Sequence, residues 1–210
     1  MHGPSTNRRH SIMTTSQLSV PAFMTPDAVD HWQAERTYWL GRLRDHYKTR
    51  FGVELDPLQS DDEAAPGVHA GLVQPKAKTK TDAFFATGAR AMLFYLQELE
   101  DHGVDPTALS AVLDFGMGFG RLTRHWLPLG PDLFGTDVTP EAVEFCKTHL
   151  GHRVSVNRNG FDPELSYKDG ALELVFANSV FTHIQSKDAS AWAKEIARIL
   201  RPRSLAIVTA

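Results

Sequence analysis

Three glycines at alternate positions follow an acidic residue near the middle of the chain. Asp114 ends the apolar run 111–113, and Gly116, Gly118 and Gly120 come next. Glycine adopts positive φ values and lets the backbone approach a ligand closely. Apolar residues at helical spacing follow, so the turn opens a helix whose free backbone N–H groups point into it. This arrangement predicts a binding site for a nucleotide cofactor.

The spacing of the glycines separates two classes of nucleotide-cofactor enzymes. Dinucleotide-binding proteins carry Gly-x-Gly-x-x-Gly, whose third small residue would fall at position 121. Arg121 occupies that position, and the third glycine comes one residue earlier. The pattern Asp-x-Gly-x-Gly-x-Gly of residues 114–120 resembles motif I of the class I S-adenosylmethionine (SAM)-dependent methyltransferases.

Later segments extend this resemblance over roughly residues 85–210. Residues 165–175 are similar to the run Leu-Pro-Phe-x-Asp-x-x-Phe-Asp-Leu-Val, which leads into strand four of many such enzymes. Residues 179–183 match a common continuation, and residues 199–202 match in part the turn before strand five. Dehydrogenases show no such series of motifs. The chain is therefore expected to be a SAM-dependent methyltransferase with a Rossmann-like fold.

The resemblance implies roles for the residues of the glycine turn. Gly116, Gly118 and Gly120 would form the floor beneath the methionine part of SAM. Asp114 would fix the loop and help to hold the amino group. Arg90, on a helix expected to lie over the cofactor, would either reach the methionine carboxylate or lie exposed on the surface.

Two residues at the ends of later strands would complete the cofactor site. Asp137 ends the second predicted strand, and an acid there can accept hydrogen bonds from the ribose hydroxyls. The alternative is that Asp137 only opens the next helix, for which Thr139 is the predicted cap. Asn159 stands where the resemblance implies a hydrogen bond to the adenine edge.

The segment after the fourth predicted strand would meet the acceptor. The resemblance implies that Asn178 and Ser179 border the methyl group. His183 is the candidate general base, which an acceptor with a high pKa would require. Its alternative role is structural, capping or filling space after the strand.

The predicted elements bring these residues to one edge of a sheet. Helices are predicted over residues 27–47 and 82–101, separated by a long loop; strands are predicted over 111–113, 133–136, 154–156, 172–176 and 205–208. Alternation of strand and helix predicts a doubly wound, mostly parallel Rossmann-like α/β sheet of about five strands. The family's last two strands are missing from this pattern. Strand five would then be an exposed apolar edge, through which a homodimer could form.

We expect three regions along the chain. Residues 1–25 read as a disordered tail, residues 26–105 as helices and a loop that cover the site, and residues 106–210 as the SAM-binding core. Trp32 and Trp39 lie on one stripe of the first helix, where they would either line a substrate pocket or pack against the core.

Composition and charge do not favour nucleic acid or membranes as partners. Hydrophobic residues make up 42% and charged residues 22% of the 210 residues, and the formal net charge is −3. This balance shows no bias toward nucleic acid or anionic membranes, and no apolar run approaches the length of a membrane span. Cys146 is the single cysteine, so no internal disulfide can form, which fits a cytoplasmic protein. No metal site is predicted.

These features predict methyl transfer from SAM to a small-molecule or glycan-like acceptor by in-line displacement. A non-catalytic methyltransferase-like binding or assembly module is the alternative, suggested by the missing strands. An NAD-dependent oxidoreductase is disfavoured by Arg121, and RNA methylation by the scattered Lys and Arg residues. The acceptor itself depends on the N-terminal cover and the loops, which carry no recognisable motif.

Overall fold

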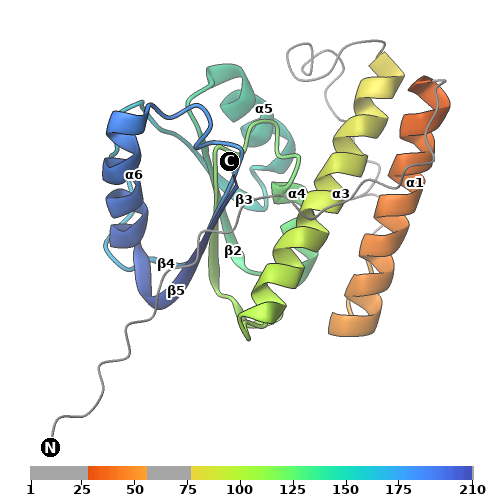
Figure 1. Ribbon diagram of the computed structural model, residues 1–210, viewed down its shortest axis with the longest axis horizontal. Helices are drawn as coiled ribbons and strands as arrows, with labels where there is room; N and C mark the ends of the chain where they lie inside the picture. The colour runs from red at the N-terminus through yellow and green to blue at the C-terminus, as the bar shows by residue number, and fades with distance from the viewer. Residues whose placement is uncertain (1–27, 56–76, 210) are drawn as a thin grey trace, which may run out of the picture.

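A five-stranded, all-parallel sheet in the order β3-β2-β1-β4-β5 forms the centre of the computed structural model, which describes residues 28–55 and 77–209 (Figure 1). The sheet with its flanking helices confirms the predicted Rossmann-like α/β fold. The helices are α1 (Ala28–His46), η1 (Tyr47–Phe51), α3 (Ala77–Asp101), η2 (Pro106–Ala108), α4 (Thr123–Trp126), η3 (Leu127–Leu129), α5 (Pro140–Leu150) and α6 (Ser186–Ile199). The strands are β1 (Ala111–Phe115), β2 (Asp132–Asp137), β3 (Val154–Arg158), β4 (Leu172–Asn178) and β5 (Leu200–Thr209).

The central strand β1 carries the glycine turn at its carboxyl end. All five of its residues are buried, as expected of a strand covered on both faces. It pairs with β2 on one side and β4 on the other, so the order of the strands reverses there. In open α/β sheets ligands bind at such a reversal, outside the carboxyl ends of the strands.

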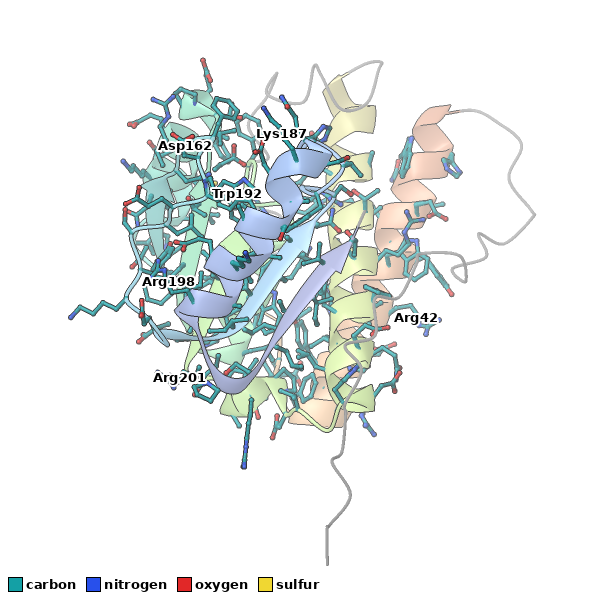
Figure 2. The ribbon with its side chains drawn as sticks, turned by 60° about the vertical axis from the view of Figure 1, so that its left-hand side comes forward. Arg42, Asp162, Lys187, Trp192, Arg198 and Arg201 are labelled. Atoms are coloured by element: carbon teal, nitrogen blue, oxygen red, sulfur yellow. The ribbon has the colours of Figure 1, made fainter. Side chains whose placement is uncertain are left out.

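Helices cover both faces of the sheet. On one face, α3, α4 and α5 pack against residues such as Phe176, which stacks on Trp126 with ring centroids 5.5 Å apart. On the other face, α6 packs through Trp192 (Figure 2), and the Trp192 ring lies 4.9 Å from that of Phe115. Helix α1 lies outside α3 (Figure 1), and Tyr47 after it donates a 2.5 Å hydrogen bond to the His125 carbonyl. The N-terminal helices are thereby attached to the sheet through α3 and α4.

Arg198 holds the segment before β4 against α6. Its guanidinium donates to Glu195 on its own helix, to Asp169 and to the Tyr167 carbonyl, at 2.6, 2.7 and 2.8 Å. Glu195 in turn accepts from the Leu165 backbone N–H at 2.7 Å. This network holds the start of the segment 165–175, which resembles a methyltransferase motif, against the end of α6 that is remote from the glycine turn.

Two predicted boundaries were wrong. Helix α3 begins at Ala77 rather than at residue 82, so the end of the predicted loop is helical. Strand β5 begins at Leu200 rather than at residue 205, because the chain turns directly from α6 into the sheet and Arg203 takes a φ of +72°. The predicted N-terminal tail lies outside the described residues. No helix within the described ranges is both long and apolar enough to cross a membrane.

Candidate functional site

A cavity of about 930 Å³ lies at the carboxyl ends of the strands, between α3 and the start of α6. It brings together residues that lie far apart in the sequence. The predicted site residues that line it are Asp114, Gly116, Gly118, Asp137, Asn159, Asn178 and His183. Gly120 does not line it. An alanine Cβ at Gly120 would lie 2.5 Å from Leu150 Cδ1, so this glycine lets the turn pack closely on α5.

The glycine turn is shaped by positive φ values and by close packing. Gly116 and Gly118 have φ values of +77° and +51°. The backbone N–H groups of Gly116 and Met117 both donate to the Thr136 carbonyl, which ties the turn to β2. A Cβ on Gly116 would meet Val180 Cγ2 at 2.3 Å, whereas one on Gly118 would meet nothing within 4 Å. Gly118 therefore presents its backbone to open space.

The carboxylate of Asp137 joins the glycine turn to the start of α5. One oxygen accepts from the Gly118 N–H and the other from the Thr139 N–H, both at 2.8 Å. The side chain of Thr139 makes no capping hydrogen bond, so the prediction that Thr139 caps α5 was wrong; Asp137 supplies the acceptor. Each carboxylate oxygen keeps a further lone-pair direction. Asp137 thus opens the helix and still faces the cavity, so its two predicted roles are compatible.

Asp114 is a buried carboxyl beneath the turn. Its Oδ2 accepts a 2.5 Å hydrogen bond from the Thr123 hydroxyl. Burial raises the pKa of Asp114 to about 7, although the Thr123 hydrogen bond and the nearby Arg121 guanidinium act to lower it. At neutral pH this group can hold either a proton or a bound cation.

Two arginines face the cavity from different elements. Arg121 follows the glycine turn and Arg90 lies on α3, so the prediction that Arg90 might lie outside the site on the surface was wrong. Burial lowers the pKa of Arg121, and the neighbouring Arg90 lowers it further. Neither guanidinium makes a hydrogen bond or ion pair with the residues that the structure describes. Arg121 is a site residue that the sequence analysis used only to reject a dinucleotide motif.

Asn159 lies beyond Asp137 at the end of β3. Its Oδ1 accepts from the Thr136 hydroxyl and its Nδ2 donates to the Gly160 carbonyl, both at 2.8 Å. The side chain is therefore held in place beside the cavity. Phe161, two residues further on, lines the cavity edge and is 83% exposed.

The segment after β4 forms the opposite wall. Ser179 has a φ of +60°, and its N–H donates to the hydroxyl and carbonyl of Thr209 on β5. Val180 then packs against Gly116, so this wall is in contact with the glycine turn. His183 is exposed at the cavity, and its backbone N–H donates to the Val180 carbonyl.

Helix α3, and not the described part of α1, contributes the remaining wall of the cavity. The cavity is lined from this side by Phe84, Thr87, Arg90, Ala91 and Phe94 of α3. Trp32 and Trp39 of α1 do not line it, and Trp39 packs against the hydrophobic core. The predicted role in a substrate pocket was therefore wrong for both tryptophans. The alternative, packing against the core, is confirmed for Trp39.

Known proteins resemble the part of the chain that carries this cavity. Residues 113–208 match the family model of a methyltransferase domain. N-terminal Xaa-Pro-Lys N-methyltransferase 1 of Mus musculus is 28% identical over 118 residues, which are 54% of this chain and 53% of that protein. An uncharacterized methyltransferase of Mycobacterium bovis is 29% identical over 46% of this chain and 38% of its own length. The chain spans about half the length of the first of these relatives.

A solved structure shares the fold. It is described as a sarcosine dimethylglycine methyltransferase from Galdieria sulphuraria, and it aligns with a TM-score of 0.51 and 20% identity. The alignment covers 68% of this chain and 54% of that one. At this level of identity the likeness concerns the fold alone.

Proposed function

We propose that this chain, whose residues 113–208 match a methyltransferase domain, is a class I SAM-dependent methyltransferase that transfers a methyl group from SAM to a small-molecule or glycan-like acceptor. One observation carries the proposal. A single cavity joins the glycine turn, Asp137 and Asn159 on one side to Asn178 and His183 on the other. A cofactor and an acceptor can therefore meet inside it.

The residues on the glycine-turn side fit SAM by their chemistry. Asp137 has free acceptor directions for the ribose hydroxyls, and the fixed Asn159 amide would meet the adenine edge. Asp114 would hold the amino group, because a buried carboxylate favours a neighbouring cation. Arg121 lies beside Asp114 and would bind the carboxylate of the same amino-acid moiety.

Bound SAM supplies an electrophilic methyl group on a sulfonium, and the chain has to position the acceptor in line with it. Asn178 and Ser179, at the end of β4, would border the methyl group. His183 lines the cavity and would accept the proton of an acceptor hydroxyl. Orientation and exclusion of water would then provide most of the rate enhancement.

Calorimetry with S-adenosylhomocysteine (SAH) tests the cofactor assignment. We expect wild-type protein to bind SAH, and Asp137→Ala to abolish that binding while Asp132→Ala leaves it unchanged. Asp132 is the matched control, because it is an exposed aspartate at the opposite end of the same strand. A folded wild-type sample that binds no SAH would contradict the proposal, and binding of NADH instead would favour an oxidoreductase.

A protein acceptor is the second candidate, favoured by the similarity to N-terminal Xaa-Pro-Lys N-methyltransferase 1. Labelled SAM incubated separately with a metabolite extract and with peptides of free N-terminus distinguishes the two. Label in the metabolite fraction supports the small-molecule acceptor, and label in the peptides supports the protein acceptor. Binding of SAH without transfer to either would identify a non-catalytic binding module. The three-region division, the β5-edge homodimer and the cytoplasmic location remain predictions.

A further inference from the structure

Arg90 is the only charged side chain that the described part of α3 contributes to the cavity lining. It lies on α3 with Phe84, Ala91 and Phe94, all of which line the cavity. The guanidinium has no hydrogen-bond or ion-pair partner within the described residues, although an arginine donates up to five hydrogen bonds. An unpaired guanidinium beside aromatic rings is a ready site for an anion.

The cofactor does not account for both arginines. The amino-acid moiety of SAM has one carboxylate, on the same carbon as the amino group that Asp114 would hold. Arg121 directly follows the glycine turn, whereas Arg90 lines the cavity from α3 beside Ala91 and Phe94. If Arg121 binds the one carboxylate of the cofactor, the Arg90 guanidinium stays available to another anion in the same cavity.

With SAM bound, the charges of the cavity and the cofactor balance, so they do not oppose an anionic acceptor. The charged side chains that line it are Arg90, Asp114, Arg121, Asp137 and Asp188, and the two buried aspartates among them have partners in the glycine turn or in α4. SAM would add a sulfonium, an ammonium and one carboxylate, so it brings a further net positive charge. Asp188, in the first turn of α6, is the acidic group of the opposite rim.

We propose that Arg90 binds a carboxylate of the acceptor and that the acceptor is an aromatic or otherwise apolar carboxylic acid. This inference rests on the proposed methyltransferase function. A carboxylate fits better than a phosphate, because one guanidinium between apolar side chains balances one negative charge. Phe84 and Phe94 would contact the apolar body of the acceptor, whose methylated group would then face Asn178 and His183.

Three planar probes of nearly equal size and different charge test this inference by calorimetry on SAH-loaded protein. They are benzoate, benzamide and benzamidine, which carry a negative, a zero and a positive charge. We expect benzoate to bind at least about tenfold more tightly than benzamide, a difference of about 1.4 kcal/mol. Benzamidine should bind more weakly than either.

Variants of the arginines assign the effect to Arg90. Arg90→Gln should remove the preference for benzoate while leaving SAH affinity within about twofold, and Arg90→Lys should retain part of the preference. Arg121→Gln should instead weaken SAH binding. Arg42→Gln is the matched control, because Arg42 is exposed on α1, hydrogen-bonded to Tyr38, and does not line the cavity.

Several results would overturn the inference. These are benzamide or benzamidine binding as tightly as benzoate, no benzoate binding to SAH-loaded wild type, or an unchanged preference in Arg90→Gln. A loss of SAH affinity in Arg90→Gln as large as that in Arg121→Gln would make Arg90 a cofactor residue and also overturn it. Failure of the proposed function is a different result, because the wild type would then bind no SAH.

Discussion

The two sides of the cavity are built in different ways. The side proposed for the cofactor consists of the glycine turn and the ends of β1 and β2, and its shape depends on backbone contacts such as those of Asp137 with Gly118 and Thr139. The side proposed for the acceptor is assembled from side chains of α3, the segment after β4 and α6, including Arg90 and His183. Substitutions on the cofactor side should therefore alter the fold of the turn, whereas those on the acceptor side should alter acceptor binding or turnover and leave the turn folded.

Gly116→Ala is expected to have the largest effect. The added Cβ would clash with Val180 Cγ2 at 2.3 Å, and alanine is strained at a φ of +77°. Overpacking costs about 1–3 kcal/mol and the left-handed conformation about 1–2 kcal/mol. We expect the free energy of unfolding to fall by about 3 kcal/mol and SAH binding to be lost, as measured by chemical denaturation and calorimetry.

Two further variants sharpen this test. Gly160→Ala, at a cavity-lining glycine where a Cβ has room, should leave both quantities nearly unchanged. Gly116→Ala combined with Val180→Ala should recover the loss of unfolding free energy that is due to the clash. The loss that is due to the positive φ should remain. Equal stability of wild type and Gly116→Ala would show that the turn tolerates movement. It would contradict the claim that the fold of the turn depends on close backbone packing.

Asp137→Asn is expected to have the next largest effect. An asparagine side chain has one acceptor oxygen, so the N–H of either Gly118 or Thr139 loses its partner. Hydrogen bonds to charged groups contribute about 1.5–3 kcal/mol each. We expect SAH affinity to fall by about 10- to 100-fold in calorimetry, with Asp132→Asn as the exposed control on the same strand. A change of less than threefold would remove Asp137 from the ribose site.

How much the sequence predicts also differs between the two sides. The glycine turn and Asp137 lie together at the cavity, as expected from the sequence, because a positive φ and a strand end leave local signals in residue type and spacing. Within the same turn, the packing of Gly120 against α5 could not be predicted from the sequence, because it depends on Leu150 in a later helix. The contribution of Arg90 depends on how α3 docks against α4, which no local pattern records.

Helix α3 shows that dependence most clearly. A Cβ on Gly88 would lie 2.5 Å from the Arg121 carbonyl and 3.0 Å from His125 Nε2, so this glycine sets how closely the helix approaches the turn. In the sequence Gly88 is one small residue within a helical pattern. Its contact with residues more than 30 positions away becomes visible only in the fold, and with it the placement of Arg90 at the cavity.

The pKa of Asp114 predicts a pH dependence on the cofactor side. Burial raises this pKa from 3.8 to about 7, so protonation of Asp114 stabilises the folded apoprotein below about pH 4, and this contribution is lost as the pH rises through 7. Thermal melts from pH 4 to 8 should show this loss in the wild type and not in Asp114→Asn.

Binding of SAH should show the opposite trend, because its ammonium group requires the ionised carboxylate. We expect the SAH affinity of the wild type to rise several-fold between pH 6 and 8, and that of Asp114→Asn to stay flat. Parallel pH profiles for the two proteins would exclude Asp114 as the partner of the amino group.

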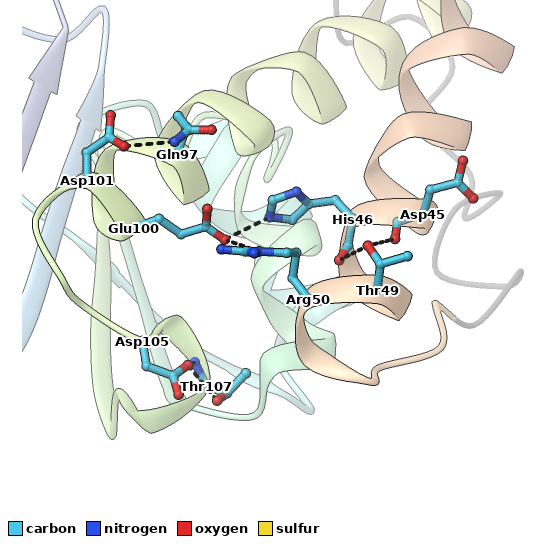
Figure 3. Close-up of polar contacts among 9 residues, drawn as sticks. All are labelled: Asp45, His46, Thr49, Arg50, Gln97, Glu100, Asp101, Asp105 and Thr107. Atoms are coloured by element: carbon cyan, nitrogen blue, oxygen red, sulfur yellow. Dashed lines mark hydrogen bonds and ion pairs between the residues drawn. The ribbon is translucent and has the colours of Figure 1, made fainter.

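The smallest effect is expected at the opposite end of α3 from the cavity. There Glu100 accepts from Arg50 at 3.0 Å and lies 3.5 Å from His46, which joins the end of α1 to α3 (Figure 3). Arg50 is exposed, and such ion pairs contribute about 0–1 kcal/mol. Glu100→Gln should therefore lower the free energy of unfolding by less than about 1 kcal/mol and leave SAH affinity within about twofold.

Asp101→Asn is the control for this variant, because Asp101 accepts a hydrogen bond from Gln97 of its own helix and makes no hydrogen bond or ion pair with the described residues of α1 (Figure 3). Denaturation and SAH calorimetry on both variants show whether the contact between α1 and α3 affects only stability or also the cavity. If Glu100→Gln weakens SAH binding by tenfold while Asp101→Asn does not, the seating of α1 on α3 controls the position of the cavity wall. Because α3 carries Arg90 and is held close to the turn at Gly88, we expect instead that α3 keeps its place when the contact with α1 is weakened.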